Sequence, residues 1–326
     1  MALLLTRADV ESALTMTDAI DAVEEAFRQQ QLGTAQLPLR TPIRIPQHKG
    51  VVLFMPAYIG GMDALGMKVV TVYPENPSQH GLPTILATVL LNDPRTGQLI
   101  AMMDGAFLTA MRTGAASGVA TKYLARPDAK VVGIFGAGIQ AQTQLRAMCV
   151  VRPVVEARIY DPMLELVGKF CRDMSAALGI DVRPVAAARE AVEGCDIIVT
   201  ASTSKTPVFD GQWIAAGTHI NGIGSHSLDA REVDSLTIQR SKVIVDLRSA
   251  ALAEAGDLVT PINAGEITAD HIYADLGEIV TGKPGRADAG EITFFKSVGL
   301  AIQDVSTAMK VYELARQKGI GQEVSL

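Results

Sequence analysis

Three basic residues in the first part of the chain have the chemistry of a carboxylate-binding site. Arg44 lies in an alternating strand-like run, Lys68 lies in the apolar run Leu65 to Val70, and Arg112 lies among small residues of a long helix. Arginine offers a planar fork to a carboxylate, and a lysine that is desolvated or lies beside other cations releases its proton readily. If they converge, the three residues can bind an acid and move a proton. Three unrelated, solvated or ion-paired residues are the open alternative.

A further candidate for proton transfer is His226. It follows the predicted strand His219 to Ile223, and the carboxyl ends of strands line the ligand crevice of a doubly wound sheet. A histidine at this place could donate a proton beside a nicotinamide ring. A loop histidine that only makes local hydrogen bonds is the alternative. Asp229, three residues later, is expected to cap a helix that begins at Ala230.

A dinucleotide site is predicted by the apolar run Val131 to Phe135, which leads into the pattern G-x-G-x-x-A and a helix. Gly136 allows the tight turn, Gly138 lets the backbone approach a pyrophosphate, and Ala141 permits close packing of helix on strand. The helix N-terminus adds free N–H groups and the positive end of its dipole. The cofactor-binding residues expected in this stretch are Gly136, Gly138, Ile139 and Gln140.

The expected preference for one cofactor rests on Asp161. It ends the next apolar run, Ala157 to Tyr160, and lies twenty residues beyond Ala141 (161 − 141). An acid at this place can hydrogen-bond the adenosine ribose and repels a 2′-phosphate, so NAD(H) is favoured and NADP(H) stays possible. A glycine triplet alone would be weak support, but here the strand, the helix and the acid all stand in the expected order.

Composition narrows the class of protein. The chain has 326 residues, of which 48% are hydrophobic and 20% charged, which suits a globular protein with a full core. A net charge of −6 argues against a nucleic-acid partner. The apolar start is too short for a signal peptide or a membrane span. Cys149, Cys171 and Cys195 have no metal-type spacing and are expected to be reduced thiols of a cytoplasmic protein.

The order of predicted elements indicates two domains. The first, residues 1–126, begins with a helix capped by Thr17, continues as a mostly antiparallel sheet with a hairpin at Asn92 to Gly97, and ends in a helix over Gly105 to Leu124. A helix within residues 300–326 is expected to pack back on this domain. The strands predicted in it are Thr41 to Ile45, Val51 to Pro56, Leu65 to Tyr73, Thr84 to Leu91 and Gln98 to Met102.

The second domain, residues 127–299, has the rhythm of a Rossmann-type doubly wound sheet, with strands and helices in alternation. Its strands are nearly continuous apolar runs, as in parallel sheets that are covered on both faces. We therefore expect an α/β protein with a dinucleotide-binding domain beside an α+β substrate domain. The predicted parallel strands are Val131 to Phe135, Ala157 to Tyr160, Val182 to Val185, Ile197 to Thr200, His219 to Ile223 and Val243 to Leu247.

Seven stretches taken together resemble the ornithine cyclodeaminase/mu-crystallin family, which also contains archaeal-type alanine dehydrogenases and ketimine reductases. The resemblance covers almost the whole chain and is far more specific than any one motif. The matching stretches are Gly66-Met67-Lys68, Gly81 to Thr84, Leu108 to Ala115, Val131 to Ala141, His219 to Gly224, Arg231 to Asp234 and Thr293 to Gly299.

The resemblance implies a Rossmann domain for NAD(P) and a substrate domain that also forms a homodimer interface. It implies that Arg44, Lys68 and Arg112 match the substrate-carboxylate and catalytic positions of the family. It places Thr84 near the nicotinamide end of the cofactor, and Asp161 at the ribose-binding acid of members that use NAD. The remaining cofactor-binding positions that it implies are Gly224 and Lys296.

Two departures from the family pattern bear on the substrate. Ornithine cyclodeaminases carry an essential aspartate where this chain has His226, and an acid that handles the substrate amine where this chain has Leu53. Both departures speak against ornithine, and the loop resembles the mu-crystallin and ketimine reductase branch. An apolar Leu53 suggests a substrate with an apolar or short side chain.

The resulting hypothesis is an NAD(H)-dependent reductase of α-imino acids. The expected substrates are cyclic ketimines such as pyrroline- or piperideine-2-carboxylate, or pyruvate with ammonia, and the reverse oxidative deamination belongs to the same chemistry. Two alternatives stay open: a cyclodeaminase that recycles NAD and releases ammonia from ornithine or lysine, and a binding protein for a small ligand. No metal site is expected.

Overall fold

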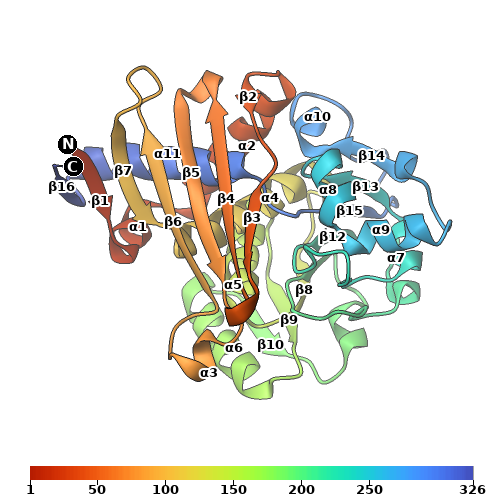
Figure 1. Ribbon diagram of the computed structural model, residues 1–326. Coiled ribbons are helices and arrows are strands. Elements are labelled where there is room, and N and C mark those ends of the chain that lie inside the picture. The colour runs from red at the N-terminus through yellow and green to blue at the C-terminus, as the bar shows by residue number, and fades with distance from the viewer. Residues whose placement is uncertain (326) are drawn as a thin grey trace. The chain divides into compact units, whose positions relative to one another are not determined.

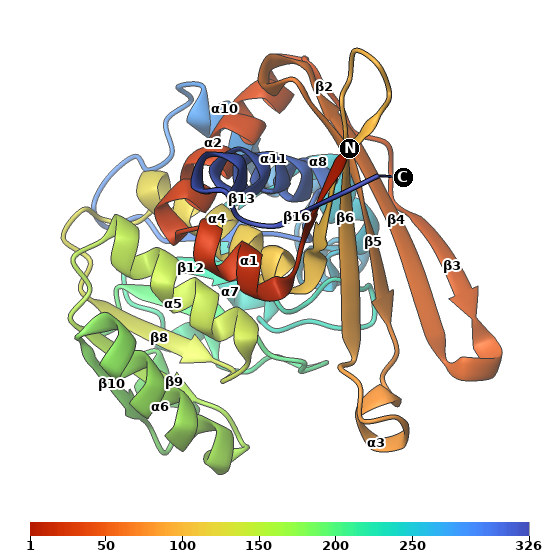
Figure 2. The same cartoon turned by 90° about the vertical axis from the view of Figure 1, so that its left-hand side faces the viewer.

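The computed structural model describes residues 1–325, which form two compact units (Figures 1 and 2). The first unit contains Met1–Arg112 and the chain from Leu300 onward, and the second contains Thr113–Gly299. The division lies inside the long helix, earlier than the boundary expected after residue 126. Within the second unit, Gln144 donates a hydrogen bond of 3.2 Å to the carbonyl of Thr113, the residue at which this unit begins.

The first unit is built on an eight-stranded sheet in the order β16-β1-β7-β6-β5-β4-β2, with β3 also paired to β4. Every pairing is antiparallel except that of β1 with β7, as predicted for a mostly antiparallel sheet. All five predicted strands are present, three of them to within a residue at each end. The strands are β1 (Ala2–Leu5), β2 (Ala35–Gln36), β3 (Thr41–Ile45), β4 (Gly50–Ile59), β5 (Ala64–Val72), β6 (Ile85–Asn92), β7 (Leu99–Asp104) and β16 (Gln322–Val324).

The helices of the first unit cover one face of this sheet. Helix α11 packs against β4, β5 and β6, and α2 lies along α11 (Figure 2). The helix cap expected at Thr17 is wrong: Thr15 caps α2, and its side chain and Asp18 form a reciprocal capping box. The helices are α1 (Arg7–Ala13), α2 (Met16–Gln31), α3 (Asn76–Gln79), α4 (Gly105–Leu124), whose second half belongs to the second unit, and α11 (Ala301–Lys318).

The second unit holds an eight-stranded, wholly parallel sheet in the order β10-β9-β8-β11-β12-β15-β13-β14. The strand order reverses between β8 and β11, which makes that point the topological switch at which open α/β sheets bind ligands. The predicted doubly wound fold is confirmed. The strands are β8 (Val131–Phe135), β9 (Glu156–Tyr160), β10 (Asp181–Pro184), β11 (Ile197–Thr200), β12 (His219–Gly222), β13 (Lys242–Val245), β14 (Ile272–Asp275) and β15 (Thr293–Lys296).

The sequence predictions missed two strands of the second unit, β14 and β15, although β15 lies between β12 and β13. Both strands have only four residues, but so do β10, β11, β12 and β13, which were predicted, so length alone does not explain the difference. The cap expected at Asp229 is also wrong, because Asp234 caps the next helix, α7. The helices are α5 (Ile139–Val151), α6 (Leu164–Leu178), α7 (Ser235–Arg240), α8 (Arg248–Glu254), α9 (Gly256–Asn263) and α10 (Leu276–Val280).

Residues 1–325 contain no helix of the length and apolar character that crossing a membrane requires. Within the same range, no group of three or more His, Cys, Asp or Glu side chains is arranged to hold a metal ion.

Candidate active site

Lys68 and Arg112 meet on one carboxylate oxygen in the first unit. The Lys68 ammonium donates a hydrogen bond of 2.8 Å to Asp304 Oδ1, and Arg112 Nε donates to the same oxygen at 2.9 Å. Arg112 also donates to the Gln303 amide oxygen at 2.6 Å. The exposed fraction is 1% for Lys68, 6% for Arg112 and 0% for Asp304. Two cations therefore share one buried anion, and the cluster carries a net positive charge.

The elements around Lys68 explain why a lysine can be buried here. Lys68 lies in the middle of β5, paired with Met55 of β4 and Val89 of β6, on the face that α11 covers. Gly66, two residues away on the same face, lets α11 approach: a Cβ there would lie 3.4 Å from Val305 and only 2.5 Å from a carbonyl oxygen of β6. The close packing of α11 on β5 brings Asp304 to the lysine.

The pKa of Lys68 is lowered from 10.5 to about 7, and burial is the largest cause. The nearby charge of Arg112 contributes to the lowering, Arg40 adds a weaker effect in the same direction, and the carboxylate of Asp304 opposes both. A lysine with a pKa near neutrality populates both its charged and its neutral form. It can therefore give a proton to a nitrogen atom or accept one from it.

Arg44 is not brought into this cluster. It is exposed on β3 opposite Val51, and it lines an open hollow of about 350 Å³. Thr41 pairs with Phe54, so the same register extended by one residue places Arg40 opposite Met55. Met55 in turn pairs with Lys68, so Arg40 lies in the row of the sheet that contains Lys68. Arg44 lies four residues further along, about 13 Å away. The register therefore assigns to Arg40 the place that the sequence suggested for Arg44.

Leu53 shares the face of the sheet with Lys68. It pairs with Val70 of β5, two residues beyond the pair of Met55 with Lys68, and alternate residues of a strand point to the same face. On this face of the sheet, the pair next to Lys68 is therefore formed by two apolar side chains, Leu53 and Val70. Thr84 lies just before β6, half-buried, and its carbonyl accepts a hydrogen bond of 2.8 Å from Tyr73 N–H, which fixes the turn that carries it.

The glycine loop of the second unit has the geometry of a phosphate cradle. Gly136 has φ +108, a conformation that favours glycine, and a Cβ there would lie 2.5 Å from the Ala201 carbonyl oxygen. Gly138 caps α5 with an ordinary φ of −87, and no atom of the described residues lies within 4 Å of the position of its Cβ. Neither its conformation nor its packing requires glycine at 138, and the space beside it is open.

Asp161 lies immediately after β9 and reaches across to the glycine loop. One carboxylate oxygen accepts a hydrogen bond of 3.1 Å from Ala137 N–H, and the other accepts one of 2.8 Å from Met163 N–H. Met163 and the first helical residue after it, Leu164, are 62% and 74% exposed. Two large apolar side chains thus lie exposed beside the Asp161 carboxylate. Ile139 and Gln140 begin α5, as expected.

Two other predicted cofactor residues lie at the carboxyl ends of the neighbouring strands β12 and β15: Gly224 and Lys296. Gly224 lies tightly against Ser202, and its N–H donates to Glu232 at 2.7 Å. Lys296, at the end of β15, is fully buried with its ammonium 2.8 Å from Asp257. His226 is exposed, and its Nδ1 is hydrogen-bonded to the Gly224 carbonyl at 3.0 Å.

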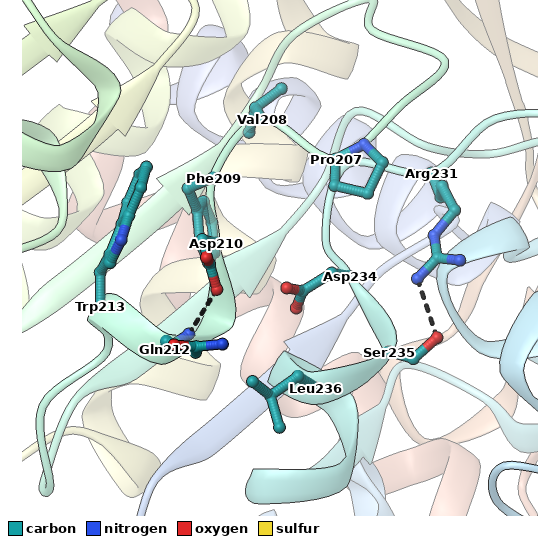
Figure 3. A pocket seen from close by; sticks show the side chains of 10 residues that line it. All are labelled: Pro207, Val208, Phe209, Asp210, Gln212, Trp213, Arg231, Asp234, Ser235 and Leu236. Carbon is teal, nitrogen blue, oxygen red and sulfur yellow. Dashed lines mark hydrogen bonds between the residues drawn. The ribbon is translucent and has the colours of Figure 1, made fainter.

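A hollow on the surface of the second unit is lined by none of the predicted site residues. It is an open depression of about 750 Å³ between the segment that carries Trp213 and the start of α7 (Figure 3). The guanidinium of Arg231, at its edge, already donates to the Val233 carbonyl and to Ser235. We assign no ligand to it. Its lining residues are Pro207, Val208, Phe209, Asp210, Gln212, Trp213, Arg231, Asp234, Ser235 and Leu236.

Three groups at the candidate site were not singled out from the sequence: Asp304, Arg40 and Glu232. Asp304 lies 236 residues from Lys68, and no local pattern connects the two. Arg40 and Arg44 are four residues apart and therefore point to the same face of an extended chain, so periodicity alone cannot choose between them. Glu232 falls in the stretch Arg231 to Asp234 that supported the family resemblance, but a carboxylate on a loop has many possible partners.

Comparison with solved structures gives close matches over the full length. The delta(1)-pyrroline-2-carboxylate reductase of Thermococcus litoralis, in complex with NADH and L-proline, is 51% identical, with a TM-score of 0.95 over 99% of this chain and 100% of that one. An archaeal alanine dehydrogenase dimer with bound NAD is 39% identical, with a TM-score of 0.93 over 100% and 99% of the two chains.

Sequence comparison agrees with the structural matches. The alanine dehydrogenase of Archaeoglobus fulgidus is 39% identical over 326 residues, which cover 99% of this chain and 98% of the relative. The model of the ornithine cyclodeaminase/mu-crystallin family matches residues 1–319. The resemblance stated from the seven sequence stretches is confirmed, and the chain belongs to the ornithine cyclodeaminase/mu-crystallin family.

Proposed function

We propose that this protein reduces a cyclic α-imino acid to the corresponding α-amino acid, with NADH as the hydride donor. The observation that carries the proposal is the buried cluster of Lys68, Arg112 and Asp304, with its net positive charge and a lysine pKa of about 7. The 51% identical relative was solved with NADH and L-proline, the reduced product of such an imine. The reverse oxidation uses the same groups.

In this proposal two arginines bind the substrate carboxylate. Arg112 presents a guanidinium beside Lys68, and Arg40 lies in the same row of the sheet, so we assign the second contact to Arg40 rather than to Arg44. Charge-assisted, bidentate contacts of this kind fix the orientation of a planar imino acid. Fixed orientation supplies a large part of the rate when two reacting atoms must meet.

Lys68 is the proposed proton donor. During reduction the imine carbon gains a hydride, and the nitrogen gains a proton from the Lys68 ammonium, so the C=N bond becomes a C–N bond and the lysine is left neutral. Asp304 holds Lys68 and Arg112 on one oxygen and keeps enough negative charge nearby for the lysine to be protonated near neutral pH. His226, exposed on its loop, stays an unassigned residue in this proposal.

The apolar row of Leu53 and Val70 next to Lys68 supports a substrate without a second charged group. A terminal ammonium placed against these side chains would lose hydration and gain no partner. Pyrroline- and piperideine-2-carboxylate fit this requirement, and pyruvate with ammonia does as well. Ornithine and lysine, the cyclodeaminase substrates, do not.

The proposed cofactor site consists of the residues around the switch point of the second unit. Gly136 and Gly138 would admit the pyrophosphate at the N-terminus of α5, and Asp161 would bind the ribose and favour NADH over NADPH. We also propose a homodimer through the first unit, where Ile43 of β3 and Leu86 of β6 lie in one row across the sheet and are 51% and 41% exposed. The dimeric alanine dehydrogenase supports this proposal. The cytoplasmic location remains a prediction.

The proposed function is tested by following NADH absorbance with a panel of preformed cyclic imines, and of α-keto acids with ammonia or methylamine. We expect rapid oxidation of NADH with a five- or six-membered cyclic imino acid. NADPH, run in parallel, should be the poorer donor. If no imine or keto acid is reduced while NADH still binds, and ammonia is released from ornithine or lysine, the protein is a cyclodeaminase and the proposal is wrong.

A further inference from the structure

A buried cluster of charges lies beneath the loops at the carboxyl edge of the parallel sheet. Lys296 and Asp257 form an ion pair of 2.8 Å, and both are fully buried. Asp257 Oδ1 accepts hydrogen bonds from the backbone N–H groups of Glu232, at 2.6 Å, and of Val233, at 3.2 Å. Glu232 is itself buried. One cation and two carboxylates are thus enclosed in a region where a charge costs free energy unless it is paired and hydrogen-bonded.

The carboxylate of Glu232 connects two loops that leave neighbouring strands. Its Oε1 accepts hydrogen bonds from Ser202 N–H at 2.7 Å and from Ser202 Oγ–H at 2.6 Å, just after β11. Its Oε2 accepts a hydrogen bond of 2.7 Å from Gly224 N–H, just after β12. A Cβ on Gly224 would lie 2.3 Å from the Ser202 carbonyl oxygen and 2.6 Å from the Glu232 carboxylate. The three segments are therefore in close contact.

The cluster is also linked to the glycine loop. The residue before Ser202, Ala201, presents its carbonyl oxygen 2.5 Å from where a Cβ of Gly136 would stand. Gly136 and Ala201 directly follow the strands β8 and β11, which flank the topological switch. A dinucleotide lies across the crevice at this point. The position of the Ser202 turn therefore determines the shape of the crevice on the side away from Asp161.

Lys296 packs on β12 and acts on Glu232 through its charge. Its aliphatic stem passes over Gly222, where a Cβ would lie 3.7 Å from Lys296 Cδ, and the two residues are paired in the register of β12 and β15. Burial raises the pKa of Glu232, and the charge of Lys296 has the largest opposing effect. The ammonium thus favours the ionised form of Glu232, the form that can accept three hydrogen bonds.

We propose that Glu232, Asp257 and Lys296 are positioning residues that hold the Ser202 and Gly224 loops in the shape that binds the nicotinamide half of the cofactor. The inference rests on the proposed NADH-dependent function. It gives Lys296, expected from the sequence to touch the cofactor, an indirect role through Glu232. No member of the cluster needs to contact the reacting atoms.

The test is the variant Glu232→Gln, which keeps the size of the side chain. Its amide oxygen can still accept hydrogen bonds from Ser202, but its NH₂ group meets the Gly224 N–H donor. We expect the Kd for NADH, measured by the fluorescence of bound NADH, to rise about tenfold, the effect of losing one charge-assisted hydrogen bond. With NADH at saturation, kcat should stay within about threefold of the wild type, because the Lys68 cluster is intact.

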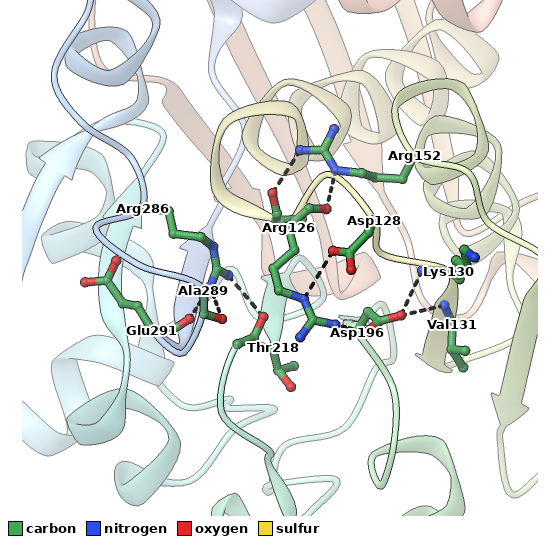
Figure 4. A network of polar contacts seen from close by, with 12 residues as sticks. Arg126, Asp128, Lys130, Val131, Arg152, Asp196, Thr218, Arg286, Ala289 and Glu291 are labelled. Carbon is green, nitrogen blue, oxygen red and sulfur yellow. Dashed lines mark hydrogen bonds and ion pairs between the residues drawn. The ribbon is translucent and has the colours of Figure 1, made fainter.

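The matched control is Asp196→Asn. Asp196 is also a carboxylate that accepts two backbone N–H groups of the second unit, from Lys130 at 2.8 Å and Val131 at 3.0 Å, and it contacts Arg126 (Figure 4). It lies at the amino edge of the sheet, away from the cofactor crevice. This variant should lose thermal stability and keep the Kd for NADH. Equal weakening of NADH binding in Asp196→Asn and Glu232→Gln would overturn the inference.

Two further variants keep the inference testable if Glu232→Gln does not fold. Ser202→Ala removes only the hydroxyl bond to Glu232 and should raise the Kd for NADH about threefold. Lys296→Met should weaken NADH binding by itself, and should add little when it is combined with Glu232→Gln. An unchanged Kd in Ser202→Ala or Glu232→Gln overturns the inference, whereas a wild-type protein that binds no NADH overturns the proposed function.

Discussion

Asp304→Asn removes the carboxylate that Lys68 and Arg112 share. At 2.8 Å, a unit charge pair with an effective dielectric constant of about 20 interacts by about 6 kcal/mol, which sets a ceiling. The asparagine retains a hydrogen-bond acceptor, so we expect the pKa of Lys68 to fall by about 1–3 units below its value of about 7. The lysine would then be almost wholly neutral at neutral pH.

The sign of the effect on activity follows from the direction of proton transfer. In reduction the charged lysine is the acid, so kcat/KM for the imine should fall as the pH rises through the pKa of the free enzyme. The wild type should show this fall near pH 7, and Asp304→Asn should show it 1–3 units lower, with a loss of about 10- to 1,000-fold at neutral pH.

The assay is the pH profile of kcat/KM for imine reduction, with thermal unfolding measured in the same buffers. Ser306→Ala, which removes a buried hydroxyl from the same helix, is the control and should leave the profile in place. Asp304→Asn also leaves the Arg112 guanidinium without its carboxylate and should lower stability by about 3–5 kcal/mol. A folded Asp304→Asn protein whose profile falls near pH 7 would refute the role of Asp304.

Three other expectations concern the two sites. Lys68→Met should be inactive. The stability of the wild type relative to this variant should rise by about 5 kcal/mol between pH 7 and 10.5, because the pKa of Lys68 is about 7 in the folded protein and 10.5 in the unfolded chain, so the folded protein binds fewer protons in that interval. Denaturant titrations at several pH values measure this difference. Arg40→Met should reduce kcat/KM for the imine about 10- to 100-fold, whereas Arg44→Met should have little effect; equal losses in steady-state assays would contradict the register argument. Asp161→Ser should lower the preference for NADH over NADPH about tenfold, and an unchanged ratio of the two kcat/KM values would remove Asp161 from cofactor selection.

The dinucleotide-binding half of the protein could be predicted from sequence because its chemistry is local. The strand β8, the turn at Gly136 and the start of α5 occupy one continuous stretch, and Asp161 follows at a fixed distance. Each of these residues is where the pattern requires it, for a reason that backbone geometry explains. The same locality made the long helix α4 predictable from Gly105 to Leu124.

The substrate half was only partly predictable because its partners come from distant parts of the chain. The apolar surroundings of Lys68 marked it as buried, but its carboxylate lies on α11, 236 residues away. The choice between Arg40 and Arg44 depends on the register of β3 with β4, which no residue pattern specified. The family motif singled out Lys296 but did not indicate its buried partner Asp257, which lies on a different segment of the chain.

The most direct test of the central claim compares wild type and Lys68→Ala in the reduction of a cyclic imino acid, with NADH binding measured in parallel. The account predicts that the wild type oxidises NADH and that Lys68→Ala binds NADH with unchanged affinity but turns over at least about a thousandfold more slowly. A Lys68→Ala protein that reduces the imine at a rate near that of the wild type would contradict the assignment of Lys68 as the proton donor.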